Sequence, residues 1–373
     1  MDLNIIDICK KKITGEDIRS WDEIATPLGY KSGEALRQAY KKYRAKDGTL
    51  PSTKSNLDLE AIELKKERIK LRDERNELNR LIRESARKET TQEIIFDAVS
   101  QLNELRPLNI SKKNITESDN EALLFLSDWH FGEQVDLKFN KYNEEVFVDR
   151  LESLTFETIK RAKLNGCKVI TIMGLGDLLS GGIHTSTRVQ NKEDIIMQTK
   201  IVSEYLAKFL YELALEFDKV NFYSVSGNHG RVFGNKEDST RNENFENLIP
   251  WYLKARTSNV SNVEIYDNNY DKDIIVTEIK GKIIFGVHGE NTKMTTISND
   301  LGGMLRYMPD IVAMGHLHFP EYRMDNQTHV FRNGSLIGNN NYSNSIYKSS
   351  DANQTLLIIS EKDVEAIYNI NLA

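Results

Sequence analysis

The sequence predicts an α/β domain that follows a small helical unit and a long helix. From Glu121 onward, short runs of aliphatic and β-branched residues alternate with amphipathic stretches of helical length. Residues 57–105 lack Gly and Pro and are rich in Glu, Lys, Arg and Leu, which favours one long helix. Ahead of them, residues 1–50 contain short helical patterns around a Gly turn. We therefore divide the chain into a helical domain over 1–50, a linker with a long helix over 51–112, and an α/β domain over 113–373.

The composition is that of an ordinary globular protein, with 39% hydrophobic and 28% charged residues. The first 112 residues carry 23 Lys and Arg against 20 Asp and Glu, and because the whole chain has a charge of −6, the remainder carries −9. Two cysteines, Cys9 and Cys167, lie far apart, which argues against a disulfide framework and indicates a reducing compartment. The N-terminus is not a signal peptide, and no apolar stretch approaches the ~20 residues that span a bilayer. We expect a cytoplasmic protein without a membrane segment.

Residues 1–50, which we call the front unit, have the sequence pattern of two helices joined by a turn. Ser20 and Glu23 form the pattern of a capping box, and a second helix begins at Ser32-Gly33-Glu34. The second helix is basic, with Arg37, Lys41, Lys42, Arg44 and Lys46. Two short helices with a basic second member resemble a helix-turn-helix unit, which would contact DNA. The alternative is a helical protein-contact module whose basic face is solvated.

Leucines recur every seven residues in the long helix, at Leu57, Leu64, Leu71 and Leu78. The companion row is half charged, with Ala61, Arg68, Arg75 and Ile82, whereas a full coiled-coil seam needs both rows apolar. Two interpretations remain open. The helix forms a short coiled coil that makes a homodimer, or it is a single helix packed on a domain.

The α/β part contains eight candidate strands and two long amphipathic helices. Lys280-Gly281 reads as a hairpin turn between two of the strands. The helices are Glu144–Lys163 and Glu193–Phe217. The strands are Leu123–Ser127, Lys168–Met173, Val220–Val225, Ile274–Ile279, Lys282–Val287, Asp310–Met314, His329–Arg332 and Thr355–Ser360.

Polar segments with metal-binding side chains follow five of these strands, and they hold five of the seven histidines. Carboxylate oxygens and imidazoles suit Mn²⁺, Fe²⁺ and Zn²⁺, and no thiolate accompanies them, which argues against a structural zinc cage. These segments offer too many potential ligands for one metal ion, and their number suits two ions. The segments are Asp128-Trp129-His130, Gly176-Asp177, Gly227-Asn228-His229, His288 between Val287 and Gly289, and Gly315-His316-Leu317-His318.

In this order the segments resemble the blocks of the calcineurin-like metallophosphoesterase family, over roughly residues 121–335. The resemblance implies a four-layer αββα sandwich of two mixed β-sheets and two divalent ions, with Mn²⁺ favoured over Fe²⁺, Zn²⁺ or Mg²⁺. It assigns Asp128, His130, Asp177 and His318 to the first ion, and Asp177, Asn228, His288 and His316 to the second. Asp177 would bridge, and His229 would be a catalytic histidine.

Two dications about 3.5–4 Å apart convert a shared water to hydroxide and draw in a phosphate. The resemblance thus implies hydrolysis of a phosphoester, with His229 giving a proton to the leaving oxygen. His184, in a Gly-rich loop, would reach the phosphate or be an ordinary surface histidine.

The chain departs from the family at two places. Many members follow the Gly-Asn-His block with Asp or Glu, which orients the catalytic histidine, whereas this chain has Gly230. The orienting group must come from elsewhere, as a side chain, a backbone carbonyl or a water. The Gly-Asp block also lacks the Asp-Arg-Gly that follows it in phosphoprotein phosphatases, which counts against a protein phosphatase.

Three functions remain open for the substrate. The first is a DNA nuclease, exonuclease or endonuclease, because the blocks are similar to those of SbcD/Mre11-type nucleases and the front unit would deliver DNA. Such nucleases work with an ATPase partner, which is in doubt here because the extra domain precedes the catalytic part. The second is a phosphodiesterase or phosphatase for a nucleotide or other small molecule, and the third is a DNA-binding scaffold with vestigial catalysis. A phage origin would fit a small DNA-binding unit fused to a nuclease.

If the substrate is DNA, basic residues near the site are expected to follow its phosphate backbone. These residues are Arg188, Arg231, Lys236, Arg241, Lys254 and Arg256.

Overall fold

The structure is a computed structural model that describes residues 1–46, 63–79, 82, 105–111, 113–183, 185–235, 243–345, 347 and 349–373. It divides into two compact units, Met1–Ala86 and Arg87–Ala373. Most of the predicted linker and part of the predicted long helix, residues 47–62 and 83–104, lie outside the described residues. Leu57 and Ala61 of the two heptad rows are among them.

Residues 1–46 of the N-terminal unit form three helices, α1 (Leu3–Thr14), α2 (Trp21–Ala25) and α3 (Gly33–Lys46). The predicted capping box is present, because Ser20 Oγ accepts from the Glu23 amide and the Glu23 carboxylate accepts from the Ser20 amide at 2.6 Å. The Asp22 carboxylate accepts from the Gly33 amide at 2.6 Å, which ties the start of α3 to α2. The helices enclose a small core of Ile6, Cys9, Ile24, Ala25, Leu36 and Tyr40.

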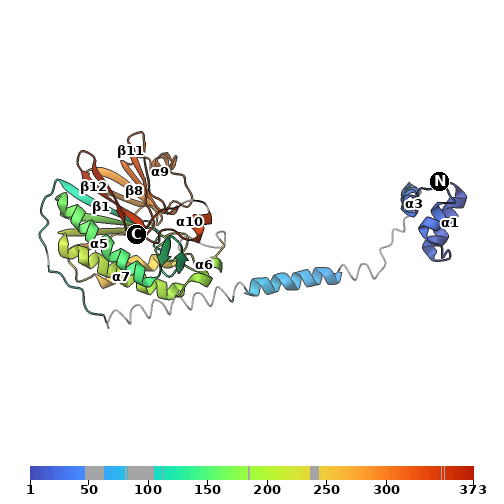
Figure 1. Ribbon diagram of the computed structural model, residues 1–373, viewed down its shortest axis with the longest axis horizontal. Coiled ribbons are helices and arrows are strands. Elements are labelled where there is room, and N and C mark those ends of the chain that lie inside the picture. The colour runs from blue at the N-terminus through green and yellow to red at the C-terminus, as the bar shows by residue number, and fades with distance from the viewer. Residues whose placement is uncertain are drawn as a thin grey trace. The chain divides into compact units, whose positions relative to one another are not determined.

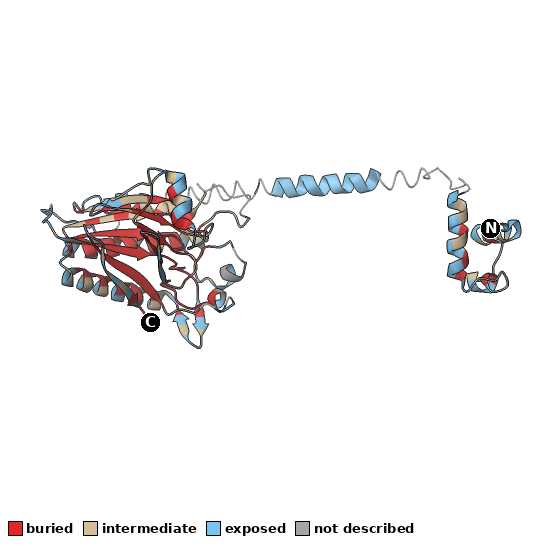
Figure 2. Ribbon diagram, turned by 90° about the horizontal axis from the view of Figure 1, so that it is seen from above, coloured by how far each residue is buried: buried red, intermediate tan, exposed pale blue. Residues whose placement is uncertain are grey.

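A further helix covers residues 63–79, and every residue in it is exposed (Figure 2). Three heptad leucines fall in this range, and Leu64, Leu71 and Leu78 are 60%, 61% and 57% exposed. Among the described residues, these leucines therefore gain no packing energy.

The second unit is built on two mixed sheets. The larger has the order β13-β12-β1-β4-β5-β6, in which β1, β4, β5 and β6 run parallel. The smaller has the order β10-β11-β9-β8-β7, with β8, β9 and β11 parallel. The strands of the larger sheet are β1 (Asn120–Leu126), β4 (Val169–Gly174), β5 (Lys219–Ser224), β6 (Val263–Ile265), β12 (Asn353–Ser360) and β13 (Val364–Asn371). Those of the smaller are β7 (Ile275–Ile279), β8 (Lys282–Val287), β9 (Ile311–Met314), β10 (Glu321–Asp325) and β11 (Thr328–Arg332).

The two sheets face each other and are covered by helices on their outer faces (Figure 1). Phe125 and Leu357 of the larger sheet meet Ile284 and Phe331 of the smaller in one core between the sheets. Helices α5 (Glu144–Leu164), α7 (Ile195–Glu216) and α8 (Leu248–Arg256) pack on the outer face of the larger sheet, and α9 (Ile297–Leu305) packs on the smaller. The predicted four-layer αββα sandwich is confirmed.

The eight predicted strands are all present, with ends shifted by at most three residues, and the two predicted helices correspond to α5 and α7. The predicted hairpin joins β7 to β8, and its residues Lys280 and Gly281 have φ of 51° and 75°, as a two-residue hairpin turn requires. The sequence did not reveal β6, β10, β13 or the ribbon of β2 (Val135–Leu137) and β3 (Asn140–Tyr142).

The shorter elements are α6 (Thr185–Gln190), α10 (Asn341–Ser345) and the 3-10 turn η2 (Phe245–Asn247), which precedes α8. Within the described ranges, no helix combines the length and the apolar character that a membrane crossing requires.

Candidate metal centre

The five polar segments lie at the carboxyl ends of β1, β4, β5, β8 and β9. Because β1, β4 and β5 run parallel, as do β8 and β9, each sheet brings its own set of strand ends to one edge. Ligand sites in α/β folds form at such edges. The seven predicted metal ligands come together here in two clusters that lie side by side.

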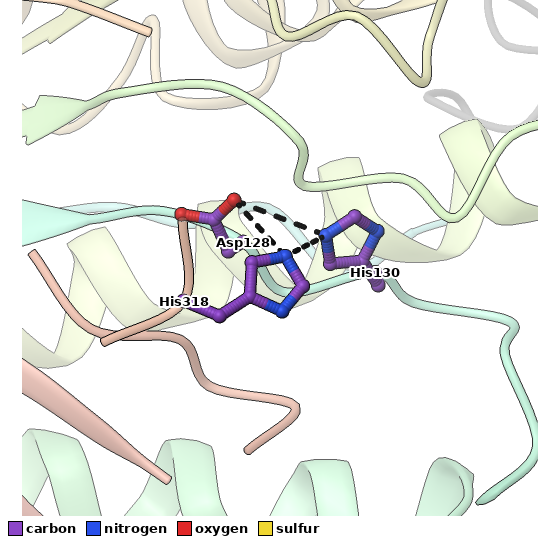
Figure 3. Close-up of side chains that lie close together, drawn as sticks. All are labelled: Asp128, His130 and His318. Carbon is purple, nitrogen blue, oxygen red and sulfur yellow. Dashed lines mark hydrogen bonds and ion pairs between the residues drawn. The ribbon is translucent and has the colours of Figure 1, made fainter. Parts of the chain in front are cut away.

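The first cluster consists of Asp128, His130 and His318 (Figure 3). The two imidazole Nε2 atoms are 3.0 Å apart, and they lie 3.8 and 3.5 Å from Asp128 Oδ1. Asp128 Oδ2 accepts from the His316 amide at 3.0 Å, which fixes the carboxylate. Asp128 Oδ1 is buried and has no hydrogen-bond donor among the described residues. Three electron-pair donors therefore converge on one point inside the protein.

The second cluster forms around His288. Its Nε2 atom lies 3.2 Å from Asp177 Oδ2, 3.1 Å from Asn228 Oδ1 and 3.2 Å from His316 Nδ1. His288 Nδ1 donates to the Leu175 carbonyl at 2.8 Å, so Nε2 is the ring nitrogen that faces the cluster. The arrangement matches the set that the resemblance implied for the second ion.

Asp177 lies between the two clusters. Its Oδ1 accepts from the His229 amide at 2.8 Å, and its Oδ2 lies 3.2 Å from His288 and 4.0 Å from His130 Nε2. One carboxylate oxygen thus reaches a histidine of each cluster. A residue in this position is suited to bridge two cations.

Five of these residues have a left-handed backbone, which is rare for side chains other than Gly. The φ angles are 52° at Asp128, 45° at His130, 54° at Asp177, 78° at His316 and 62° at His318. The chain therefore turns sharply at the ligands that follow β1, β4 and β9, and backbone strain of this kind clusters at functional sites.

Electrostatics favour charged carboxylates in the clusters. Burial raises the pKa of Asp128, but the interactions with His130 and the other histidines nearby outweigh burial and leave that pKa below its usual range. The same holds for the pKa of Asp177, which is brought well below its usual range despite burial, chiefly by the charge of His288. Burial lowers the pKa of His318 to about 3, so this imidazole is neutral at physiological pH. Charged carboxylates beside a neutral imidazole form a set of metal ligands.

His288 behaves differently. Burial would lower its pKa, but the charge of Asp177 outweighs burial and raises that pKa to about 10. The proton on this imidazole compensates the buried carboxylate, and a divalent cation in the second cluster would replace it. The oxygen and nitrogen donors, the unsatisfied Asp128 Oδ1 and the absence of thiolates among the described cluster residues all fit divalent ions of borderline hardness.

His229 stands at the edge of the first cluster, with its ring centroid 4.5 Å from that of His130. Its Nδ1 donates to the Ser180 carbonyl at 2.9 Å. This backbone carbonyl is the orienting group that the sequence left open. Since Nδ1 carries the hydrogen, Nε2 is the atom that can exchange a proton at the site. His229 also lies within ligand distance of His130 and Asp177, so its catalytic role stays a prediction.

Glu246, on the turn η2, is a buried residue of the site that sequence reasoning missed. Its carboxylate accepts from three backbone amides, those of Asp177 at 3.2 Å, Leu179 at 3.0 Å and Gly227 at 2.7 Å. The first two belong to the Gly-Asp loop and the third to the Gly-Asn-His loop. One carboxylate therefore joins the loops that carry Asp177 and Asn228.

The same turn explains Gly230. A Cβ atom at this position would lie 2.2 Å from Asn244 Oδ1 and 2.9 Å from Glu246 Cγ. The space that an Asp or Glu would fill at this point is occupied by a turn from later in the chain. The spacing of motifs in the sequence does not predict this contact, because Gly230 and Glu246 are 16 residues apart.

The other predicted site residues are distributed differently. His184, Lys236 and Arg241 lie outside the described residues. The expectation that Lys254 and Arg256 track DNA is not supported, because Lys254 pairs with Asp267 at 2.5 Å and buried Arg256 pairs with Glu204. Arg188 is exposed and Arg231 lies next to the metal centre.

Several known proteins are similar to this chain. The chain is 24% identical over 360 residues to the SPbeta prophage-derived protein YonJ of Bacillus subtilis (strain 168), covering 91% of this chain and 88% of the relative. Residues 60–102 match the YonJ coiled-coil domain. Among solved structures, an archaeal phosphodiesterase is 13% identical with a TM-score of 0.36, covering 66% of this chain and 99% of its own. Vps29 of Entamoeba histolytica, solved with Zn²⁺, is 14% identical with a TM-score of 0.31, covering 67% and 99%.

Residues 122–348 match the family described as calcineurin-like phosphoesterase, and this range includes every residue of both clusters. The relative order of the ligand segments, the two facing mixed sheets and the two clusters at their strand ends are all accounted for by this match. The chain belongs to the calcineurin-like phosphoesterase family.

Proposed function

We propose that this protein is a two-metal-dependent phosphodiester hydrolase that cleaves DNA. The observation that carries the proposal is the pair of ligand clusters joined by Asp177, at the strand ends of a phosphoesterase domain. Asp128, His130, Asp177 and His318 would hold one cation, and Asp177, Asn228, His288 and His316 the other. Two bound divalent ions, Mn²⁺ in the first instance, supply Lewis-acid activation of water and neutralise charge on the phosphate.

The residues of the chain have distinct tasks in this reaction. Asp177 holds the two clusters in register through its Oδ2 atom, while the His229 amide fixes its Oδ1. His229 keeps one proton on Nδ1, bound to the Ser180 carbonyl, so its Nε2 is the atom that would deliver a proton to the leaving oxygen. The phosphorus–oxygen bond to that leaving group breaks as water adds to phosphorus.

The front unit supports DNA as the substrate. On α3, the side chains of Arg37, Gln38, Lys41 and Lys42 are exposed and fall on one side of the helix, while Leu36 and Tyr40 are buried. A basic, solvent-facing helix at the end of a three-helix segment suits the major groove. The similarity to a prophage-derived protein is consistent with a DNA substrate. The resemblance of the ligand segments to those of SbcD/Mre11-type nucleases is also part of this proposal. An ATPase partner is not required by any feature of the described residues.

A homodimer through the long helix belongs to the proposal as well. The exposed leucines of residues 63–79 would be covered by the same helix of a second copy, and the match to a coiled-coil domain supports this. Light scattering of the purified chain tests it. A dimer that becomes monomeric in a Leu71→Lys variant would support the proposal, and a wild-type monomer would contradict it.

A second function, hydrolysis of a small phosphodiester, is favoured by one observation. Lys254 and Arg256 are engaged in ion pairs, which leaves few described cations near the centre to follow a polynucleotide. The scaffold with vestigial catalysis has no specific observation in its favour.

The test uses labelled linear DNA, single- and double-stranded, with Mn²⁺, beside bis-p-nitrophenyl phosphate. We expect cleavage of both kinds of substrate, and loss of both in Asp177→Ala and His229→Ala. His329→Ala is the matched control, because His329 pairs with Asp363 away from the clusters. A Lys41→Gln/Lys42→Gln variant should lose DNA cleavage while the small diester is still hydrolysed. If the small diester is hydrolysed while DNA stays intact, the protein is a small-molecule phosphodiesterase and not a nuclease. If neither substrate is hydrolysed, the DNA-binding scaffold with vestigial catalysis is the remaining function.

A further inference from the structure

A cavity of about 690 Å³ opens beside the second cluster, next to His288 and Gly227. Its walls come from the loop after β5, the start of β7, the turn after β8 and helix α9. Its volume lies in the range of about 300–1,000 Å³ that is typical of small-molecule sites. A substrate whose phosphate sits on the metal centre would place one of its two ester groups in or near this cavity.

Arg231 lines this cavity together with His288. Its Nε donates to the Asn228 carbonyl at 3.0 Å, which positions the guanidinium beside a predicted ligand. Its Nη1 is buried and has no partner among the described residues, although a buried charged donor is costly without one. Arginine binds phosphate oxygens with two parallel hydrogen bonds, so a phosphate on the metal centre would satisfy it.

The rest of the cavity is acidic rather than basic. Three carboxylates line it, those of Asp273, Glu290 and Asp300, and Arg231 is the one Lys or Arg among its described lining residues. Carboxylates repel a second phosphate, but they accept hydrogen bonds from the exocyclic amino groups of nucleobases. Apolar side chains of Ile274, Leu301 and Met304 complete the walls and offer a surface for a flat ring.

We infer that this cavity binds the nucleoside attached to the scissile phosphate, and that this nucleoside carries no further phosphate. The inference rests on the proposed function, in which DNA is the substrate. A nucleoside with only one phosphate occurs at the end of a strand. The cavity therefore makes the enzyme end-directed, releasing terminal nucleotides, because an internal nucleoside would bring its second phosphate among the carboxylates.

The first test compares linear and circular single-stranded DNA of one sequence, with Mn²⁺ and the full chain. We expect the circle to be cut at least tenfold more slowly than the linear strand. Cutting of both at similar rates would overturn the inference while upholding the nuclease.

The second test does not depend on DNA cleavage. Deoxyadenosine monophosphate, inorganic phosphate and deoxyadenosine 3′,5′-bisphosphate are compared as inhibitors of bis-p-nitrophenyl phosphate hydrolysis, and their binding is measured by calorimetry. The monophosphate should bind at least tenfold more tightly than either of the others. If DNA is not cut but the monophosphate shows this preference, the DNA substrate is wrong and the nucleoside cavity is upheld. Equal binding of monophosphate and inorganic phosphate would overturn the cavity.

A third test reverses the charge of one cavity carboxylate and measures the effect on binding of a second phosphate. Asp300→Lys should raise the affinity for the bisphosphate relative to the monophosphate by about tenfold, because a cation then faces the second phosphate. Asp119→Lys is the matched control, since Asp119 is exposed and precedes β1, at the end of the strand away from the site. An unchanged ratio in Asp300→Lys would place the nucleoside elsewhere and overturn the assignment.

Discussion

Glu246 offers the sharpest test of how the metal centre is held together. In Glu246→Ala, the amides of Asp177, Leu179 and Gly227 lose their acceptor inside the protein. A buried donor without an acceptor costs about 1–3 kcal/mol, so three such donors could cost up to about 9 kcal/mol. Removal of a buried charge near Asp177 offsets part of this, and water can enter the space. We therefore expect a loss of about 3 kcal/mol in the free energy of unfolding.

Glu246→Gln should be intermediate. The Oε2 atom accepts from Asp177 and Gly227, and Oε1 accepts from Leu179. An amide oxygen in place of Oε2 retains two of the three bonds, so the expected loss is about 1–3 kcal/mol. Because the freed loops carry Asp177 and Asn228, Mn²⁺ affinity should fall by about 10–100-fold in the alanine variant.

Urea denaturation and calorimetric titration with Mn²⁺ measure the two effects. Glu243→Ala is the matched control, because Glu243 is a partly exposed carboxylate three residues away, and a change of at most about 0.5 kcal/mol is expected there. If Glu246→Ala matched this control in stability and in Mn²⁺ affinity, Glu246 would not hold the two ligand loops together.

Three further predictions follow from single positions. Gly230→Ala should lower the free energy of unfolding by about 1–3 kcal/mol in urea denaturation, because the new methyl group collides with the turn η2, whereas Gly182→Ala adds a methyl group in open space and should not. His229→Ala should retain the Mn²⁺ stoichiometry of the wild type while bis-p-nitrophenyl phosphate turnover falls by about 10²–10⁴-fold; a lost ion would make His229 a ligand instead. Burial raises the pKa of Cys167 to about 12 and also raises the pKa of Cys9, so at pH 8 both are unreactive thiols. Ellman's reagent should detect neither in the native protein and both in guanidinium, and a fast-reacting native thiol would contradict the burial.

The fold was predictable where strands are buried on both faces, because such strands carry continuous apolar runs. β1, β4 and β9 are of this kind. The strands that were missed lie at sheet edges or are short, and β10 and β6 bury little of their length. Their pairing is decided by neighbours distant in sequence, which a local pattern does not contain.

The site was predictable where the chemistry needs a particular side chain. The clusters around Asp128 and His288 assemble from residues that the motifs name. The groups that support them were not predictable. A backbone carbonyl orients His229 and therefore leaves no mark on the sequence, and Glu246 reaches the loops from a turn with no motif of its own.

The left-handed residues at the strand ends bear on protein engineering. Each such residue costs about 1–2 kcal/mol, so the five ligands together cost on the order of 5–10 kcal/mol, comparable to the net stability of a whole domain. A designer who transplants Asp-x-His and Gly-His-x-His onto regular strands would keep the spacing but lose these turns, and the side chains would diverge. A successful graft must carry the bends with the ligands, together with enough surrounding structure to hold them.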